Sequence, residues 1–268
     1  MRANRVRSLP VVISLTLFGL IGLPAQGRDQ TGFLPPQYEW VYNLQPWDDM
    51  NANGWEWQRR LSSEDPAIVE DPTAPVSPLN VLQMVFTPDM PYGHEPSVHW
   101  LALPMTTEIY TAFWMKLSSN WTCALNEWCT HISYLFAQNT DGQVYTALFH
   151  PADDQAGPPY RVGANTEWAP YITNRILPNV ETTWVNPGEW HKLEYYYKWE
   201  SRPGAGNGII RWWVDGVLNG DYPNVHYPDT RGFIEFQHGP TFGTPLETQY
   251  MSIDHTLLRY LVRTTSAR

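Results

Sequence analysis

The chain has 268 residues, of which 43% are hydrophobic, 14% aromatic and 16% charged. This composition excludes an intrinsically disordered chain, because such chains lack the apolar residues that build a core. The 24 prolines and 18 glycines argue against a helical bundle and favour short strands joined by turns. We therefore expect an all-β protein.

The N-terminal residues have the pattern of a secretory signal peptide. Three arginines among the first seven residues precede an apolar run, Val11–Leu23, and the small residues of Ala25–Gly27 follow it. The run is shorter than the roughly 18 to 20 apolar residues that span a bilayer. We expect residues 1–27 to be cleaved and residues 28–268 to form one domain. The product is then secreted, extracellular or periplasmic, with no membrane attachment.

Charge narrows the class of partner. Cleavage would leave 14 basic and 27 acidic residues, a net charge of −13. This disfavours nucleic acid, whose binding depends on clustered Lys and Arg. The 14 tryptophans suit a protein that presents flat rings to sugars, although we expect most of these rings to pack in the core.

Cys123 and Cys129 are the two cysteines of the chain. In an oxidising compartment their spacing predicts a disulfide across the loop Trp121–Thr130, whereas two sulfur ligands alone do not form a zinc site. The closed loop is short, so the disulfide is expected to contribute about 2 kcal/mol of stability.

Runs of aromatic and β-branched residues predict at least seven strands, after a proline-rich segment, Glu64–Pro78, that we expect to be an extended surface loop. In chain order the strands are Glu108–Leu117, His131–Gln138, Val144–His150, Trp190–Trp199, Ile209–Val214, Phe233–Gln237 and Met251–Val262. Asp215-Gly216 predicts a type I′ hairpin, because that turn needs positive φ at both central residues. The irregular aromatic alternation favours two stacked sheets, an antiparallel jelly-roll sandwich.

Two segments resemble the concanavalin A-like jelly rolls. Gly188–Tyr196 contains a Trp-His-x-hydrophobic-Glu pattern, and Asn207–Val217 contains a Trp-x-Asp-Gly hairpin. Three further segments resemble secreted bacterial proteins of the polysaccharide-lyase-like branch of that family: Asp71–Pro78, Phe113–Trp121 and Tyr250–Leu258. The similarity covers residues 65–262. It implies a jelly roll with a glycan groove on its concave sheet, and hence a polysaccharide partner.

The resemblance implies a β-eliminating lyase. Such an enzyme neutralises a uronate carboxylate, removes the C5 proton with a base and protonates the leaving O4. The candidates, with Arg or Gln for the carboxylate, His as base and Tyr as acid, are Gln237, His238, Arg211, His131 and Tyr134. The chain departs from alginate-lyase relatives, because their Gln-x-His strand and their Tyr-x-Lys strand near the C-terminus are not legible in it.

Alternation along a strand assigns the faces. In Phe233–Gln237 it places Phe233, Glu235 and Gln237 on the groove side, and Ile234 and Phe236 on the core side.

The same rule places Arg211 and Trp213 together, as groove-facing residues that would bind substrate. The face of the His131–Gln138 strand stays open, because alternation separates His131 from Tyr134.

Two other functions remain in view. A noncatalytic lectin would use the same groove. A glycoside hydrolase would need two carboxylates about 5 to 9.5 Å apart. Glu235 is the best candidate, with Glu194 or Asp254 as its partner.

Gly93–His99 suggests a metal site, but Pro96 prevents a helical His-Glu-x-x-His geometry. We therefore favour a structural or groove-lining, substrate-binding role for His99. The resemblance implies that Ca²⁺ is a possible cofactor, although no Asp-rich loop identifies its ligands.

Overall fold

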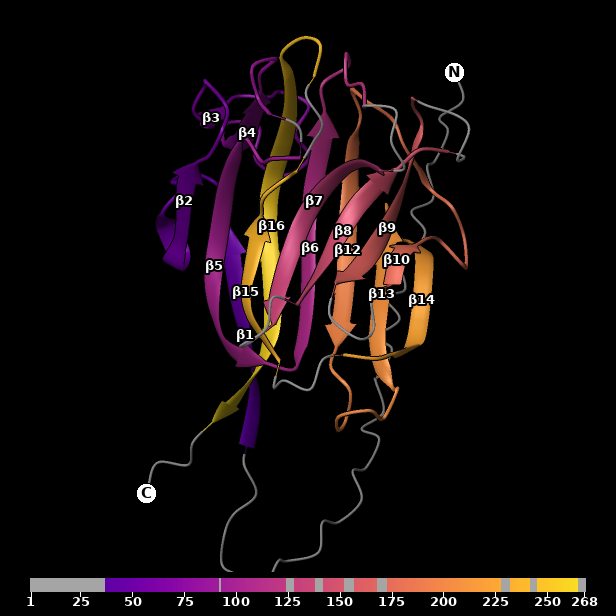
Figure 1. Cartoon of the computed structure of the whole chain (residues 1–268). Coiled ribbons are helices and arrows are strands. Elements are labelled where there is room, and N and C mark those ends of the chain that lie inside the picture. The colour runs from indigo at the N-terminus through magenta and orange to yellow at the C-terminus, as the bar shows by residue number, and fades with distance from the viewer. Residues whose placement is uncertain are drawn as a thin grey trace, which may run out of the picture. The chain divides into compact units, whose positions relative to one another are not determined.

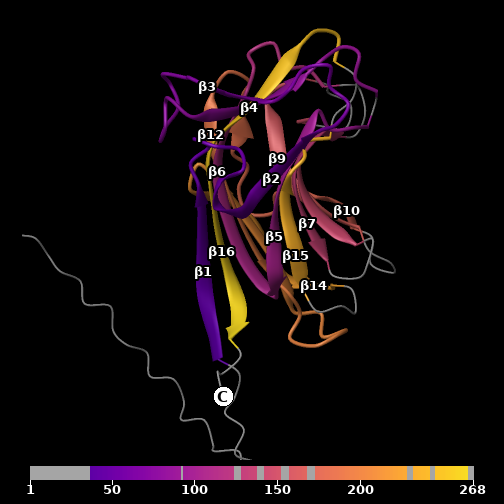
Figure 2. The ribbon, with the colours of Figure 1, turned by 90° about the vertical axis from the view of Figure 1, so that its left-hand side faces the viewer.

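Two antiparallel sheets, stacked face to face, make up the computed structural model (Figure 1). The structure describes residues 37–91, 93–123, 128–137, 142–151, 157–167, 173–227, 232–241 and 245–264. By its contacts the chain divides into residues 1–35 and 36–268, and the described residues all belong to the second unit. The expected signal peptide lies outside them. Figure 2 shows the two sheets from the side as separate layers.

Sheet A has eight strands: β1 (Gln37–Gln45), β3 (Ala67–Val69), β4 (Val81–Phe86), β6 (Glu108–Leu117), β12 (Trp190–Lys198), β13 (Gly208–Val214), β14 (Val217–Val225) and β16 (Gln249–Thr264). Their order is β14-β13-β12-β6-β16-β4-β3, and β1 also pairs with β16. Neighbours in the sheet are therefore often distant in the sequence.

Sheet B also has eight strands: β2 (Trp55–Arg59), β5 (Ser97–Thr106), β7 (Trp128–Ala137), β8 (Gln143–Phe149), β9 (Tyr160–Glu167), β10 (Thr173–Ile176), β11 (Trp184–Val185) and β15 (Phe233–His238). Their order is β10-β9-β8-β7-β15-β5-β2, and β11 pairs with β9. A short 3₁₀ turn, η1 (Ala52–Gly54), precedes β2. In the described part of the chain, no helix is long and apolar enough to cross a membrane.

The predicted jelly-roll sandwich and its strands are confirmed. Asp215 and Gly216 have φ values of 52° and 78° and join β13 to β14, as the hairpin pattern requires. The proline-rich segment contains the short strand β3, and its backbone amides at Val76 and Ser77 donate to Asp254 of β16. The segment is therefore held against sheet A by hydrogen bonds.

The core lies between the sheets and is built largely from aromatic rings. Trp47, Trp55, Trp121 and Trp212 are each at most 1% exposed. The Trp212 indole nitrogen donates to the carbonyl of Val162 over 3.1 Å and so ties sheet A to sheet B. A buried indole N–H needs such a partner.

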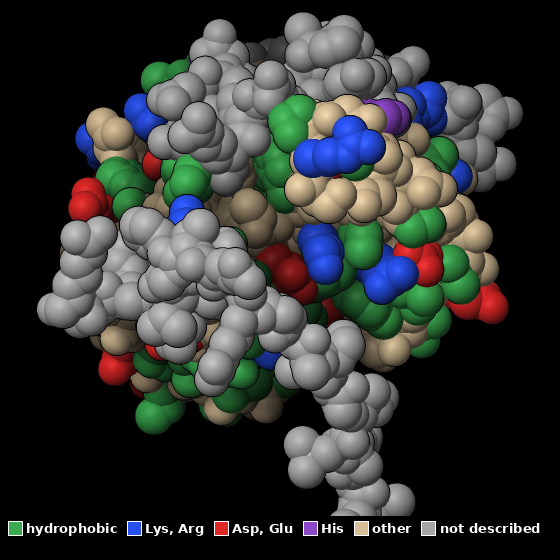
Figure 3. All heavy atoms as spheres, turned by 90° about the horizontal axis from the view of Figure 1, so that it is seen from below, with side chains coloured by type: hydrophobic (Ala, Val, Ile, Leu, Met, Phe, Trp, Pro, Cys, Tyr) green, Lys and Arg blue, Asp and Glu red, His purple; other side chains and the backbone are tan. Residues whose placement is uncertain are grey.

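The predicted disulfide joins Cys123 to Cys129. It lies beside the buried ring of Trp121, whose indole nitrogen is 3.4 Å from Cys129 Sγ. The disulfide thus closes its loop against the core. Seen from below, the sandwich carries basic, acidic and apolar side chains interspersed on that end (Figure 3).

Candidate active site

A β-bulge in β7 brings His131 and Tyr134 to the same face of sheet B. His131 and Ser133 pair with consecutive residues of β8, so Ile132 is an extra residue in β7. Ile132 is fully buried in the core. After the bulge the alternation resumes one step out of phase. The separation of His131 from Tyr134 that strict alternation predicts is therefore wrong.

One row of side chains crosses sheet B at Tyr134. The register places Gln237 of β15 opposite Tyr134, Tyr134 opposite Tyr145 of β8, and Tyr145 opposite Asn165 of β9. On the other side of β15, Trp100 of β5 lies opposite Gln237. Directly opposite residues have Cβ atoms about 4.5 to 5.5 Å apart, so the five side chains form a contiguous row.

His131 lies next to this row and forms a hydrogen-bonded pair with Tyr134, a member of the row. His131 Nδ1 lies 2.5 Å from the Tyr134 hydroxyl, which lies 2.7 Å from Thr241 Oγ1. Burial lowers the pKa of His131 to about 3, so its imidazole is neutral at neutral pH. Burial also raises the pKa of Tyr134, so its phenol keeps its proton. The pair combines a proton acceptor with a proton donor.

A second hydrogen-bond network, on β8 and β9, lies next to the pair and forms the floor of the candidate site. Tyr145 donates to Glu167 Oε1 over 2.8 Å, and Asn165 Nδ2 donates to the Tyr145 hydroxyl over 2.9 Å. Gln143 Nε2 donates to the other oxygen of Glu167 over 2.7 Å. Burial and the bond to Glu167 raise the pKa of Tyr145. Satisfied buried networks of this kind hold their side chains in one arrangement.

Two carboxylates, Glu95 and Glu167, act electrostatically on the His131–Tyr134 pair. Besides burial, the charges of Glu95 and Glu167 raise the pKa of Tyr134. Glu95 itself pairs with Arg60 over 3.5 Å. Glu235 lies two residues from Gln237 in β15, and partial burial raises its pKa.

The expected face of β15 needs one correction. A register shift lies between Phe233 and Glu235. It turns Phe233 into the core, where it is fully buried, and leaves Ile234, which alternation assigns to the core, partly exposed. Glu235 and Gln237 are both partly exposed, whereas Phe236 is in the core as predicted.

His99 and His238 lie in the core, apart from this site. They are opposite each other in β5 and β15, and both are fully buried. His238 Nε2 is 3.0 Å from Thr256 Oγ1, and its ring stacks on Trp55 with centroids 5.8 Å apart. Because consecutive strand residues face opposite sides, His238 points away from Gln237. This placement removes His238 as a base and His99 as a substrate-binding residue.

Arg211 and Trp213 are not brought to the site either. Both belong to β13 in sheet A, where Arg211 Nε pairs with Asp221 Oδ1 over 2.6 Å. Their buried neighbours on β13 face the core, so these two side chains lie on the outer face of sheet A. The two outer faces look in opposite directions, and a glycan on sheet B cannot reach them.

The two carboxylates expected to pair with Glu235 in a hydrolase also lie away from sheet B. Glu194 lies on the outer face of sheet A, where it accepts a hydrogen bond from Tyr110 and pairs with Lys192 over 3.1 Å. Asp254 is fully buried beneath the proline-rich segment. Neither shares a face with Glu235.

Sequence reasoning missed several residues of the site, because the strands β5 and β9 were not predicted. Asn165 and Glu167 alternate with Ala164 and Thr166, a period-two pattern that signals a strand. Thr241 gives no local signal, since it follows β15 in a loop. Within the described ranges, no group of three or more His, Cys, Asp or Glu is placed to hold a metal ion.

Comparisons with known proteins bear on the fold. No protein-family model matches the chain, and no curated protein matches it in sequence. Solved structures do resemble it. Alginate lyase Aly36B has a TM-score of 0.53 at 10% identity, over 84% of this chain and 98% of that one.

Two further lyase structures are similar. An endo-β-1,4-glucuronan lyase from the fungus Trichoderma reesei has a TM-score of 0.51 at 18% identity, over 84% of this chain and 95% of that one. Alginate lyase vAL-1 from a Chlorella virus has a TM-score of 0.52 at 10% identity, over 77% and 93%. At these identities the likeness concerns the backbone. The chain therefore has the concanavalin A-like jelly-roll fold that these lyases share, as the sequence resemblance predicted.

Proposed function

We propose that this chain is a polysaccharide lyase, which binds a uronate-bearing glycan on the outer face of sheet B and cleaves it by β-elimination. The observation that carries the proposal is the contact between the neutral imidazole of His131 and the protonated phenol of Tyr134, beside Gln237. The fold likeness to alginate and glucuronan lyases supports the same reaction class.

The proton roles depend on which atom donates in two hydrogen bonds, and the geometry allows either direction in both. When His131 Nδ1–H and the Thr241 hydroxyl both donate to the Tyr134 oxygen, the phenol proton is directed to substrate and Nε2 carries the accepting lone pair of His131. His131 is then the base and Tyr134 the acid. Two donated hydrogen bonds also stabilise the phenolate that forms when Tyr134 gives up its proton.

The reaction moves one proton from C5 to O4. His131 Nε2 takes the C5 proton, the electron pair forms the C4–C5 double bond, and the C4–O4 bond breaks. Tyr134 protonates the departing O4, and the Nδ1 proton of His131 restores the phenol. Positioned acids and bases of this kind contribute about 10²- to 10⁴-fold in rate.

The rest of the row would position the sugar. Trp100 offers a flat ring on which a pyranose face can stack, and the Gln237 amide can donate to the uronate carboxyl group. Tyr145 and Asn165 hold the floor beneath them.

The test records ultraviolet absorbance and new reducing ends while the full chain acts on uronate-bearing and neutral polysaccharides, with and without Ca²⁺. Unsaturated, absorbing products are expected. Tyr134→Phe and His131→Gln should each lower the rate by about 10²-fold or more. Tyr196→Phe is the matched control, because it removes a phenol–carboxylate bond of 2.6 Å, to Glu108 on sheet A.

Other outcomes refute the proposal. Reducing ends without absorbance would indicate hydrolysis, and glycan binding with neither signal would indicate a lectin. We also propose that the chain is secreted after loss of residues 1–27. N-terminal sequencing of the exported protein tests this, and an intact N-terminus would contradict it.

A further inference from the structure

The site that we propose for elimination is acidic. Glu167 accepts two hydrogen bonds in the floor of the site, and Glu235 shares a strand face with Gln237. Glu95 is close enough to raise the pKa of Tyr134, as Glu167 also does. An anionic sugar at Tyr134 would therefore be bound among like charges, which disfavours it.

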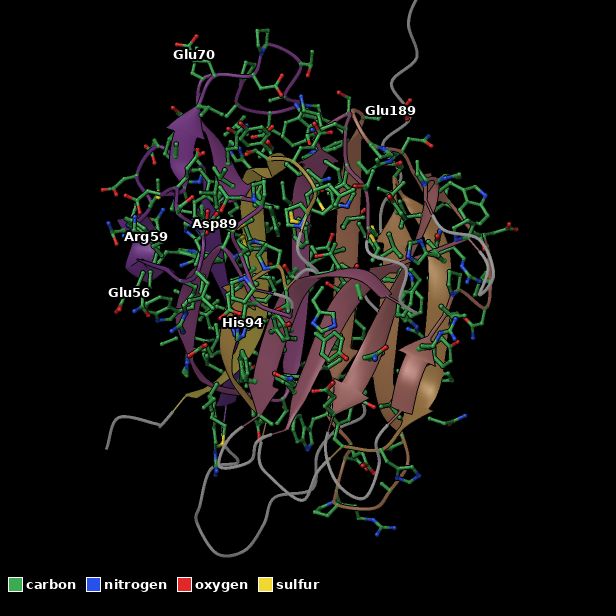
Figure 4. The ribbon with its side chains drawn as sticks, turned by 45° about the horizontal axis from the view of Figure 1, so that its top comes forward. Glu56, Arg59, Glu70, Asp89, His94 and Glu189 are labelled. Carbon is green, nitrogen blue, oxygen red and sulfur yellow. A yellow bond between two sulfur atoms is a disulfide. The ribbon has the colours of Figure 1, made fainter. Side chains whose placement is uncertain are left out.

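The basic side chains described on the strands and loops of this sheet have other contacts. Arg59 pairs with Asp65 over 3.3 Å, and Figure 4 shows it at the β2 edge of the sheet. Arg60 is paired with Glu95, and Arg161 Nε donates to the carbonyl of His150 over 3.0 Å.

The backbone amide of Arg175 donates to Asn165 Oδ1 over 2.7 Å, so this basic residue adjoins the row. The experiment therefore includes an Arg175 variant.

The acidic character of the site bears on which form of the uronate carboxyl group can react. The negative charge of a free carboxylate opposes the negative charge that develops when C5 loses its proton. An enzyme must therefore neutralise the carboxylate with a cation or with strong hydrogen-bond donors. An esterified carboxyl group is already neutral, and it acidifies the C5 proton without any cation. A neutral amide such as Gln237 suffices to hydrogen-bond an ester carbonyl.

We infer that the reacting uronate is bound as a carboxyl ester, such as a methyl ester. This inference rests on the proposed lyase function and specifies its substrate class. His131, Tyr134 and Gln237 then act on a neutral sugar. The nearby carboxylates disfavour binding of the free acid.

The experiment compares polyglucuronate, polymannuronate and polygalacturonate, each as the free acid and as the methyl ester of matched chain length. The full chain is assayed by ultraviolet absorbance in the presence of a chelator. For the uronan that is cleaved, kcat/KM on the ester should exceed that on the free acid by about tenfold or more, which corresponds to about 1.4 kcal/mol.

Two variants test the electrostatic reason. Glu95→Gln should narrow the ratio between ester and free acid, mainly by raising activity on the free acid. Glu39→Gln is the matched control, because this exposed residue of β1 belongs to sheet A, and it should leave the ratio unchanged.

Equal or faster elimination on the free acid would overturn the inference and leave the proposed function standing. So would a ratio that Glu95→Gln does not move, or a loss of free-acid activity specific to Arg175→Gln. Failure to eliminate any of the six polymers would instead overturn the proposed function, and the inference with it.

Discussion

The two histidines buried between the sheets should make the stability of this protein sensitive to acid. Burial lowers the pKa of both His99 and His238 from an ordinary value of 6.5 to about 3. Between these values the unfolded chain binds protons that the folded protein does not, so folding stability rises with pH. Stability is therefore lost as pH falls from about 6.5 toward 3.

The magnitude follows from the same two pKa values. At pH 5, protonation of each histidine stabilises the unfolded chain relative to the folded protein by about 2 kcal/mol, since one pKa unit corresponds to about 1.4 kcal/mol. At pH 7 the effect of each is small, because the histidine is then mostly unprotonated in both the folded and the unfolded chain. The two histidines together should remove about 4 kcal/mol between pH 7 and pH 5, out of the 5 to 15 kcal/mol or so that is typical of a domain.

Urea unfolding at pH 7 and pH 5 measures this loss, for the wild-type chain and for His99→Gln/His238→Gln. The double variant is expected to be less stable at pH 7, because its side chains fit the aromatic surroundings of the histidines less well. The diagnostic quantity is the change between the two pH values, which should shrink by about 4 kcal/mol. His131 and the carboxylates titrate in both proteins and largely cancel in this comparison.

The exposed His94 supplies the control. His94→Gln should leave the pH dependence as in the wild type. If the double variant loses as much stability on acidification as the wild-type chain does, the two buried histidines are not the origin of the acid sensitivity, and the reasoning fails.

Two further predictions concern packing and buried charge. Gly220→Ala should destabilise the fold by about 1 to 3 kcal/mol, because its Cβ would lie 2.1 Å from the Trp212 ring. Thermal unfolding measures this loss. Gly239→Ala, whose Cβ meets nothing closer than 3.5 Å, should be tolerated in that assay, and equal losses in the two variants would contradict the packing argument. Asp254→Asn weakens the acceptor for two loop amides and should cost about 1 to 3 kcal/mol, whereas the exposed Asp48→Asn should change the melting temperature little.

Local pattern was sufficient for much of the architecture. The strand Glu108–Leu117 was predicted with the bounds that β6 has, because the segment is rich in aromatic and β-branched residues. The Asp215-Gly216 hairpin was equally legible, since few residue pairs accept positive φ twice. The disulfide followed from there being two cysteines at close spacing.

The site was less predictable, because a single extra residue reverses every face that follows it. The bulge at Ile132 places His131 beside Tyr134, and the shift before Glu235 buries Phe233. Bulges have no reliable sequence signature, since the neighbouring strand determines where the extra residue is accommodated.

The sequence by itself therefore determined seven of the strands, the turn, the disulfide and the two-sheet class, because each depends largely on residues close together in the chain. Only the tertiary structure decided that Arg211 belongs to one sheet and Gln237 to the other, and that Tyr145 and Asn165 join the row with Tyr134. Strand order is set by packing the whole apolar surface between two layers. That is a property of the complete chain, which no local pattern contains.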